Sequence, residues 1–238
     1  GRISFDLGLY ENAQNHFLKG LSLISMYTIK NARKVFIAWL GRTYIYSGKI
    51  NEGLKTLNMV KADREIYFFL SEAYFFLKQY RKALTCSEKS LAIDVVYPRV
   101  PDEKIEWIDG FSLIEGKYSR LSNRGAVFLR LLKVFRAYLI SHCLGLKEGI
   151  TEFYAILRTG KDNKLDPYYS LYYFLYSQLL QKSGEDETDD YLTILNKALK
   201  QLQERASRIE VPSDRTKYLF NNFWNNHIFN EAKKKNLV

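Results

Sequence analysis

A short pattern that occurs four times along the chain constrains its fold more than any other feature. Each copy has an apolar residue, two polar residues and then Gly or Ala, and the copies begin at Tyr10, Ile50, Tyr80 and Leu146. An apolar-periodic helix precedes the last three copies. We expect each copy to open a new helix, and its small residue to let two antiparallel helices cross closely. The pattern therefore predicts a stack of helical hairpins.

The composition favours the same architecture. Only 4 of the 238 residues are Pro and 13 are Gly, while 47% are hydrophobic, which suits long helices around a substantial core and disfavours turn-rich all-β folds. The two cysteines, Cys86 and Cys143, can form at most one bridge, so a disulfide framework is excluded. No stretch has the roughly 20 apolar residues of a membrane span, and none resembles a signal peptide.

The spacing within the copies resembles the tetratricopeptide repeat (TPR), a helix-turn-helix unit of about 34 residues. The repeat that starts at Arg64 fits best, and the one that starts at Lys34 follows it with a shorter second helix. The residues of the Arg64 repeat that fall on the signature positions are Tyr67, Leu70, Ser71, Tyr74, Ala83, Ser87 and Ser90. Gly1 takes the place of a signature Gly in a first helix, so we expect a C-terminal piece of a longer solenoid.

The resemblance implies an all-α fold, a TPR-like α-solenoid of antiparallel helix pairs with a C-terminal capping helix pair. We expect TPR repeats over residues 1–97, the first one truncated. Residues 98–123 contain two Pro and two Gly, which predicts an irregular insertion. Residues 124–238 are expected to form TPR-like hairpins and the cap, with one helix starting near Arg124 and the terminal pair capped by Ser213 or Asp214.

Motifs for chemistry are missing from the sequence. His16, His142 and His227 fall in different predicted hairpins, and none has a second metal-type ligand at helical spacing. There is no P-loop, nucleophile elbow or dinucleotide fingerprint. We therefore expect a non-enzymatic protein with no catalytic, cofactor-binding or metal-binding residues and no small-molecule substrate. Its expected partners are other proteins, because repeat solenoids offer them a long concave surface.

The TPR resemblance also implies which side chains line that surface. The concave positions of the two first helices carry aromatic residues in excess of those needed for packing, which suggests a partner. The expected partner-binding groove consists of Trp39, Arg42, Tyr46, Phe68, Phe69, Glu72, Phe75 and Phe76. The alternative is that some of these aromatic residues are core, because aromatic stripes at helical spacing usually pack inward.

The formal net charge of +10 raises the question of nucleic acid. A local basic cluster lies in a stretch without acidic residues and includes Arg124, Arg130, Lys133 and Arg136. Such a cluster binds phosphates when it is free. The interpretation we favour is a solvated helix face, so nucleic acid is not the expected partner.

The tail shows a second resemblance. Residues 199–209, followed by Phe223, Trp224 and Asn225 and a Lys-rich end, are similar to the C-terminus of large spirochaetal TPR proteins. Some of those are scaffolds of the periplasmic flagellar motor collar. The resemblance implies a protein-interaction scaffold in a multi-protein periplasmic assembly with a role in motility. The alternatives are a cytoplasmic TPR adaptor or regulator, and a nucleic-acid or anionic-surface binder that uses the basic cluster.

Overall fold

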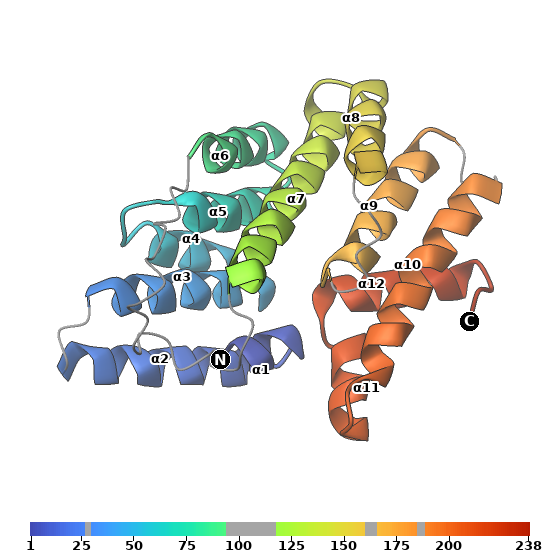
Figure 1. Ribbon diagram of the computed structural model, residues 1–238. Helices are drawn as coiled ribbons and strands as arrows, with labels where there is room; N and C mark the ends of the chain where they lie inside the picture. Colours follow the sequence, from blue (N-terminus) through green and yellow to red (C-terminus); the bar gives the residue numbers. More distant parts are fainter. Residues whose placement is uncertain (27–29, 94–117, 160–165, 185–188) are drawn as a thin grey trace.

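The computed structural model describes residues 1–26, 30–93, 118–159, 166–184 and 189–238, and these residues form twelve α-helices and no strand (Figure 1). The helices of the first half are α1 (Arg2–Asp6), α2 (Tyr10–Met26), α3 (Lys30–Tyr46), α4 (Ile50–Leu57), α5 (Arg64–Phe76) and α6 (Tyr80–Ala92). Those of the second half are α7 (Tyr118–Cys143), α8 (Leu146–Thr159), α9 (Tyr169–Lys182), α10 (Asp189–Ser207), α11 (Pro212–Phe220) and α12 (Phe223–Lys234).

Each helix packs on its neighbours in the sequence, and the helices form successive pairs. In Figure 1, α1 to α6 form a stack at the left, α9 to α12 lie at the right, and α7 runs between the two groups. The predicted all-α solenoid of helix pairs is confirmed. The boundaries of the three predicted segments stay a prediction, because residues 94–117 lie outside the described part of the chain.

All four copies of the short pattern begin a helix, as predicted. Tyr10, Ile50, Tyr80 and Leu146 are the first residues of α2, α4, α6 and α8. An apolar residue at the start of a helix can pack back against the preceding helix, while the two polar residues that follow face water. The pattern therefore marks the second helix of each pair.

The small residue at the end of the pattern lies where the two helices of a pair cross. A Cβ atom added at Gly53 would lie 2.8 Å from the carbonyl oxygen of Gly41 on the preceding helix, and one at Gly149 would lie 2.5 Å from the Cβ of Ser141. The corresponding Ala83 is fully buried. The predicted close approach of the helices is confirmed at these crossings.

The turns of the first three pairs share one left-handed residue. Gly8, Gly48 and Lys78 have φ angles of 71°, 84° and 58°, and each lies two positions before the second helix. The next residue closes the turn, as where the Lys49 amide donates to the carbonyl oxygen of Tyr44 over 2.9 Å. This is the Schellman ending of a helix, which favours Gly at the left-handed position. Lys78 therefore adopts a conformation that is strained for a side chain with a Cβ.

Two helix starts differ from the prediction. α7 begins at Tyr118 rather than near Arg124, and it continues through Gly125. The α11 cap is Val211, not Ser213 or Asp214, and Pro212 takes the first helical position. Proline suits that position, since its fixed φ is helical and its missing N–H is not needed there.

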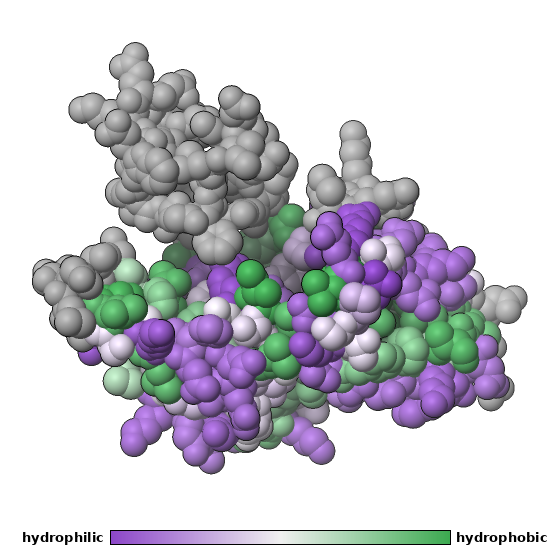
Figure 2. Space-filling view, turned by 90° about the horizontal axis from the view of Figure 1, so that it is seen from below, coloured by the Kyte–Doolittle hydropathy of each residue, from purple (hydrophilic) through white to green (hydrophobic). Residues whose placement is uncertain are grey.

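One apolar core runs from α1 through α9, and a second, smaller one joins α9, α10 and α12. The view from below shows hydrophilic side chains over much of this face, with hydrophobic residues between them in separate groups (Figure 2). None of the described helices has the length and apolar character needed to cross a membrane.

Candidate functional site

The residues of the predicted groove lie inside the molecule. Trp39, Phe68 and Phe69 expose only 6%, 1% and 1% of their surface, and the charged residues Arg42 and Glu72 expose 8% and 3%. The remaining three are partly buried and pack on the main core, and they are Tyr46, Phe75 and Phe76. The structure thus brings all eight residues together, but it does not leave them open to a partner.

The second half of the chain fills the concave face of the repeats. The ring of Phe68 lies 5.6 Å from those of Phe128 and Phe135, both on α7. Phe76 contacts α12, where its ring lies 4.9 Å from that of Phe223. The expectation of an open groove is therefore wrong. The aromatic residues in excess of the repeat's own packing are used to bind helices of the same chain.

A chain of hydrogen bonds crosses this interface. The Nε and one terminal nitrogen of Arg42 each donate to a different oxygen of the Glu72 carboxylate over 2.8 Å. The hydroxyl of Tyr46 donates to Glu72 over 2.7 Å, and the indole Nε1 of Trp224 donates to that hydroxyl over 3.0 Å. The bonds join α3, α5 and α12, so they hold the C-terminal pair against the repeats.

Aromatic rings surround the buried guanidinium. The ring centroids of Phe69, Phe5 and Trp39 lie 4.7, 5.0 and 5.3 Å from the guanidinium carbon of Arg42, at distances where cation–π attraction acts. Burial lowers the pKa of Arg42, but the Glu72 carboxylate and Tyr46 together raise it, and the net shift is upward. The guanidinium therefore stays ionised, and we assign it a structural role in joining α3 to α5.

The two ends of the described chain also meet directly. The Nδ2 of Asn222, in the turn between α11 and α12, donates to the carbonyl oxygen of Asp6 over 3.1 Å. The turn between α1 and α2 approaches so closely that a Cβ at Gly8 would lie 2.5 Å from the backbone nitrogen of Asn222. These contacts close the solenoid on itself.

The side chains of the predicted basic cluster contact different acidic residues of the same chain. Arg130 lies 3.4 Å from the buried Asp166 carboxylate, which also accepts from the amide of Tyr168 over 2.9 Å. Arg205 of α10 donates to the carbonyl oxygen of Asp166 over 3.2 Å. Burial raises the pKa of Asp166, and the Tyr168 amide and Arg130 oppose that shift. Arg130 thus fastens α7 to the start of α9.

Arg136 is engaged in a similar way. It pairs with Glu152 of α8 and lies 3.7 Å from Glu88 of α6. Lys133 is exposed, and the side chain of Arg124 lies outside the described residues. Two of the four predicted basic residues, Arg130 and Arg136, therefore pair with acidic residues of the same chain instead of forming a fully solvated helix face.

A histidine and a lysine meet where α7 and α9 end. The Nζ of Lys182 lies 2.7 Å from the Nε2 of His142, and the ring of Tyr80 stacks on the imidazole at 4.1 Å. Burial and the nearby Lys182 ammonium lower the pKa of His142 to about 4. The imidazole is therefore neutral near pH 7, and its Nε2 can accept a hydrogen bond from the ammonium. Among the described residues, no group of three or more His, Cys, Asp or Glu side chains could hold a metal ion.

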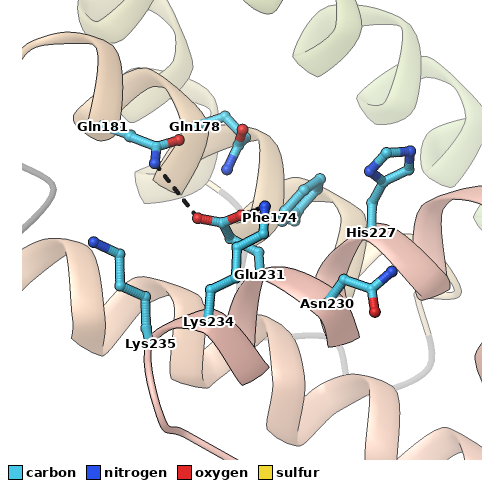
Figure 3. A pocket seen from close by; sticks show the side chains of 8 residues that line it. All are labelled: Phe174, Gln178, Gln181, His227, Asn230, Glu231, Lys234 and Lys235. Carbon is cyan, nitrogen blue, oxygen red and sulfur yellow. Dashed lines mark hydrogen bonds and ion pairs between the residues drawn. The ribbon is translucent and has the colours of Figure 1, made fainter.

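A polar pocket lies between α9 and α12, with a volume of about 540 Å³ (Figure 3). Gln178, Gln181, His227 and Glu231 are among the residues that line it. This site was not predicted from the sequence. Its one signal was Gln178, the only amide side chain in residues 168–180, which are otherwise aromatic, aliphatic or Ser.

Comparisons with known proteins match both halves of the chain. A tetratricopeptide repeat model matches residues 65–94, which cover α5 and α6. The family model TP_0123_C, described as a C-terminal domain, matches residues 118–236, half of the chain. The comparison with curated proteins gives no match, and neither does the one with solved structures. The predicted resemblance to a TPR protein and to the C-terminal part of a larger protein is confirmed, and the chain belongs to the TP_0123_C family.

Proposed function

We propose that the protein is a non-enzymatic scaffold for protein–protein interaction. The observation that carries this proposal is the TPR hairpin of α5 and α6, whose Phe75 and Phe76 pack on Trp224 and Phe223 of α12. Repeats of this kind present surfaces to proteins rather than substrates to reactive groups. Here the concave face of the repeats contacts helices of the same chain. The two halves then form one body with fixed geometry, whose outer faces can bind partners.

The structure favours a scaffold over an adaptor that opens and closes. Hydrogen-bonded and aromatic contacts join the two halves, among them those of the Asp6 carbonyl with Asn222 and of Trp224 with Tyr46 and Phe75. Aromatic anchors of this type dominate the energy of protein interfaces. When such contacts hold the two halves together, the outer surfaces keep their relative positions. A scaffold that assembles several proteins requires this fixed geometry.

The test is reciprocal purification of the chain at its native level, followed by mass measurement of the complex. We expect a complex of fixed stoichiometry that is recovered equally from either partner. A chain that stays a free monomer, or one that turns over a substrate, would contradict the proposal. Specific binding of nucleic acid at physiological salt would favour the basic-cluster alternative instead.

The finer part of the proposal is membership of the spirochaetal periplasmic flagellar motor collar. Its support is the resemblance of residues 199–209 and the tail at Phe223–Asn225, a segment that the family match also covers. Cryo-electron tomography of motors from cells without the protein is expected to show a collar with missing density. An intact collar, with the protein recovered from the cytoplasm in a stable complex, would keep the scaffold and assign it to a cytoplasmic adaptor.

A further inference from the structure

The first turn of α6 carries positive charge where the other helices of the pattern carry an acid. α2, α4 and α8 have Glu11, Glu52 and Glu148 in their first turns. α6 has no acidic residue there, and the two polar positions of its pattern are Arg81 and Lys82. The N-terminal end of a helix has a partial positive charge, so two cations at this place destabilise α6. A local rule that is broken at a cost in stability indicates a functional surface.

These cations border a groove between α5 and α6, which has a volume of about 280 Å³. The residues that line it are Tyr74, Arg81, Lys82, Thr85 and Cys86. The Nζ of Lys82 lies 5.6 Å from the ring centroid of Tyr74. Seven residues away on each helix, the Nζ of Lys89 lies 5.8 Å from the ring centroid of Tyr67. Cation–π attraction thus places two ammonium groups in a row along α6, and with Arg81 they are called the α6 cations below.

The charge of the α6 cations is not neutralised by the described part of the chain. None of them forms an ion pair with another described residue, and a tyrosine ring attracts an ammonium without cancelling its charge. Glu88, the acidic residue of α6, lies 3.7 Å from Arg136 of α7 instead. Burial raises the pKa of Cys86 in the groove, and the Lys89 ammonium opposes that shift. The groove therefore has a positive potential that an acidic partner would complement.

The spacing of the two ammonium groups indicates the form of that partner. Lys82 and Lys89 are seven residues apart in one helix, which corresponds to about 10 Å along its axis. Carboxylates seven positions apart on a partner helix lie on one face at the same spacing. In an extended segment the side chains of one face recur about every 7 Å, so its carboxylates lie about 7 or 13 Å apart. A helix therefore matches the two ammonium groups better than a strand does.

We propose that the groove between α5 and α6 binds an acidic helix of a partner protein, with two carboxylates seven positions apart on Lys82 and Lys89. Arg81 adds a planar fork that can pair with a further carboxylate. The volume of about 280 Å³ is small for a whole ligand, but it suits an apolar side chain of the helix against Tyr74 and Cys86. The proposal rests on the scaffold function, for which it supplies the chemistry of one partner.

The experiment uses the whole chain and a stapled, fluorescent helical peptide with three Glu residues on one face, the outer two seven positions apart. The matched control is an isomer whose Glu residues are distributed around the helix, and a single-stranded oligonucleotide is titrated in parallel. The variants are Arg81→Gln, Lys82→Gln and Lys89→Gln. The control variant is Lys147→Gln, which removes an exposed cation from the corresponding place in α8. Anisotropy gives the affinity, thermal unfolding the stability, and NMR the backbone amide signal of Thr85.

We expect the one-face peptide to bind about tenfold more tightly than its isomer and to move the Thr85 signal. Lys82→Gln and Lys89→Gln should each weaken binding several-fold, whereas Lys147→Gln should have no effect. Arg81→Gln should weaken binding while the melting temperature stays unchanged or rises, because a cation leaves the first turn of α6.

Equal binding of the two peptides would overturn the proposal, and so would an affinity that Lys82→Gln and Lys89→Gln leave unchanged. Tighter binding of the oligonucleotide at physiological salt, lost in the same variants, would assign the groove to phosphates instead. The acidic residues Asp102, Glu106 and Asp109 lie outside the described part of the chain. If changing these three residues to their amides strengthens peptide binding, the chain itself occupies the groove and the proposal fails.

The double variant Lys82→Gln, Lys89→Gln separates this proposal from the scaffold function. If it still returns the full complex in reciprocal purification and the one-face peptide does not bind the unaltered chain, the groove proposal fails and the scaffold stands. If the unaltered chain returns no complex, the scaffold itself fails. Loss of one component with the others retained is the outcome expected when both are right.

Discussion

The Arg42–Glu72 pair, which joins α3 to α5, provides a quantitative test of whether the second half of the chain covers the concave face of the repeats. Arg42→Met and Glu72→Gln each remove one charge from a buried pair whose side chains are 9% and 4% exposed. The double variant removes both charges and keeps similar volumes. If the pair is buried by the second half of the chain, each single variant should lower the unfolding free energy by more than the loss of an exposed ion pair would.

The structure sets the size of the effect. Breaking a buried ion pair from one side costs about 3–5 kcal/mol of unfolding free energy, because an uncompensated charge stays buried. Glu72→Gln should fall near the lower end, about 3 kcal/mol, since the rings around Arg42 remain to stabilise the cation. Replacing both charges at once is often neutral, so we expect the double variant within about 1 kcal/mol of the original chain. The coupling free energy should then exceed about 2 kcal/mol.

Urea unfolding followed by far-ultraviolet circular dichroism measures all three variants. The control is Lys34→Met, which removes one side of the partly exposed pair of Lys34 with Asp63 at 2.6 Å. A surface pair of this kind contributes at most about 1 kcal/mol. If Glu72→Gln costs no more than Lys34→Met, Arg42 and Glu72 are solvated, and the closed interface described above does not exist.

Three further predictions concern the turns and one titrating group. Lys78→Gly should raise the unfolding free energy by about 0.5–1 kcal/mol, because Gly adopts the left-handed turn without strain; an unchanged or lower value in urea unfolding would contradict that φ. Gly8→Ala should cost clearly more than Gly48→Ala in the same assay, since both pay the left-handed strain but only Gly8 meets the backbone of Asn222; equal costs would mean that the ends are apart. Lowering the pH from 6.5 to about 4 should reduce the unfolding free energy, because the unfolded chain protonates His142 first. His142→Gln should flatten that dependence, and identical profiles would refute the buried imidazole.

The helix pairs could be predicted because their signals are local. Ile50 and Tyr80 open helices through their own neighbours in the sequence, and the need for Gly53 at a crossing involves a helix only a few residues away. Such contacts form between adjacent elements in any TPR-like chain. The Lys78 turn shows the limit, since no Gly marks its left-handed residue.

The occupation of the groove could not be predicted for the opposite reason. Tyr46 and Trp224 are 178 positions apart, and their hydrogen bond depends on how the whole second half turns back. An aromatic residue such as Phe68 looks the same in the sequence whether a partner or the chain itself covers it. The ion pairs of the basic cluster could not be predicted for the same reason. Arg130 of α7 pairs with Asp166, which lies 36 positions further along the chain and beyond α8.

In the closed molecule the C-terminal helices occupy the concave face of the repeats. NMR can test this arrangement at Trp224, whose indole N–H donates to the hydroxyl of Tyr46. We expect a nuclear Overhauser contact between the indole proton and the Tyr46 ring, together with slow exchange of that proton with solvent. Rapid exchange and no contact with Tyr46 would contradict it, and would show that the groove is open.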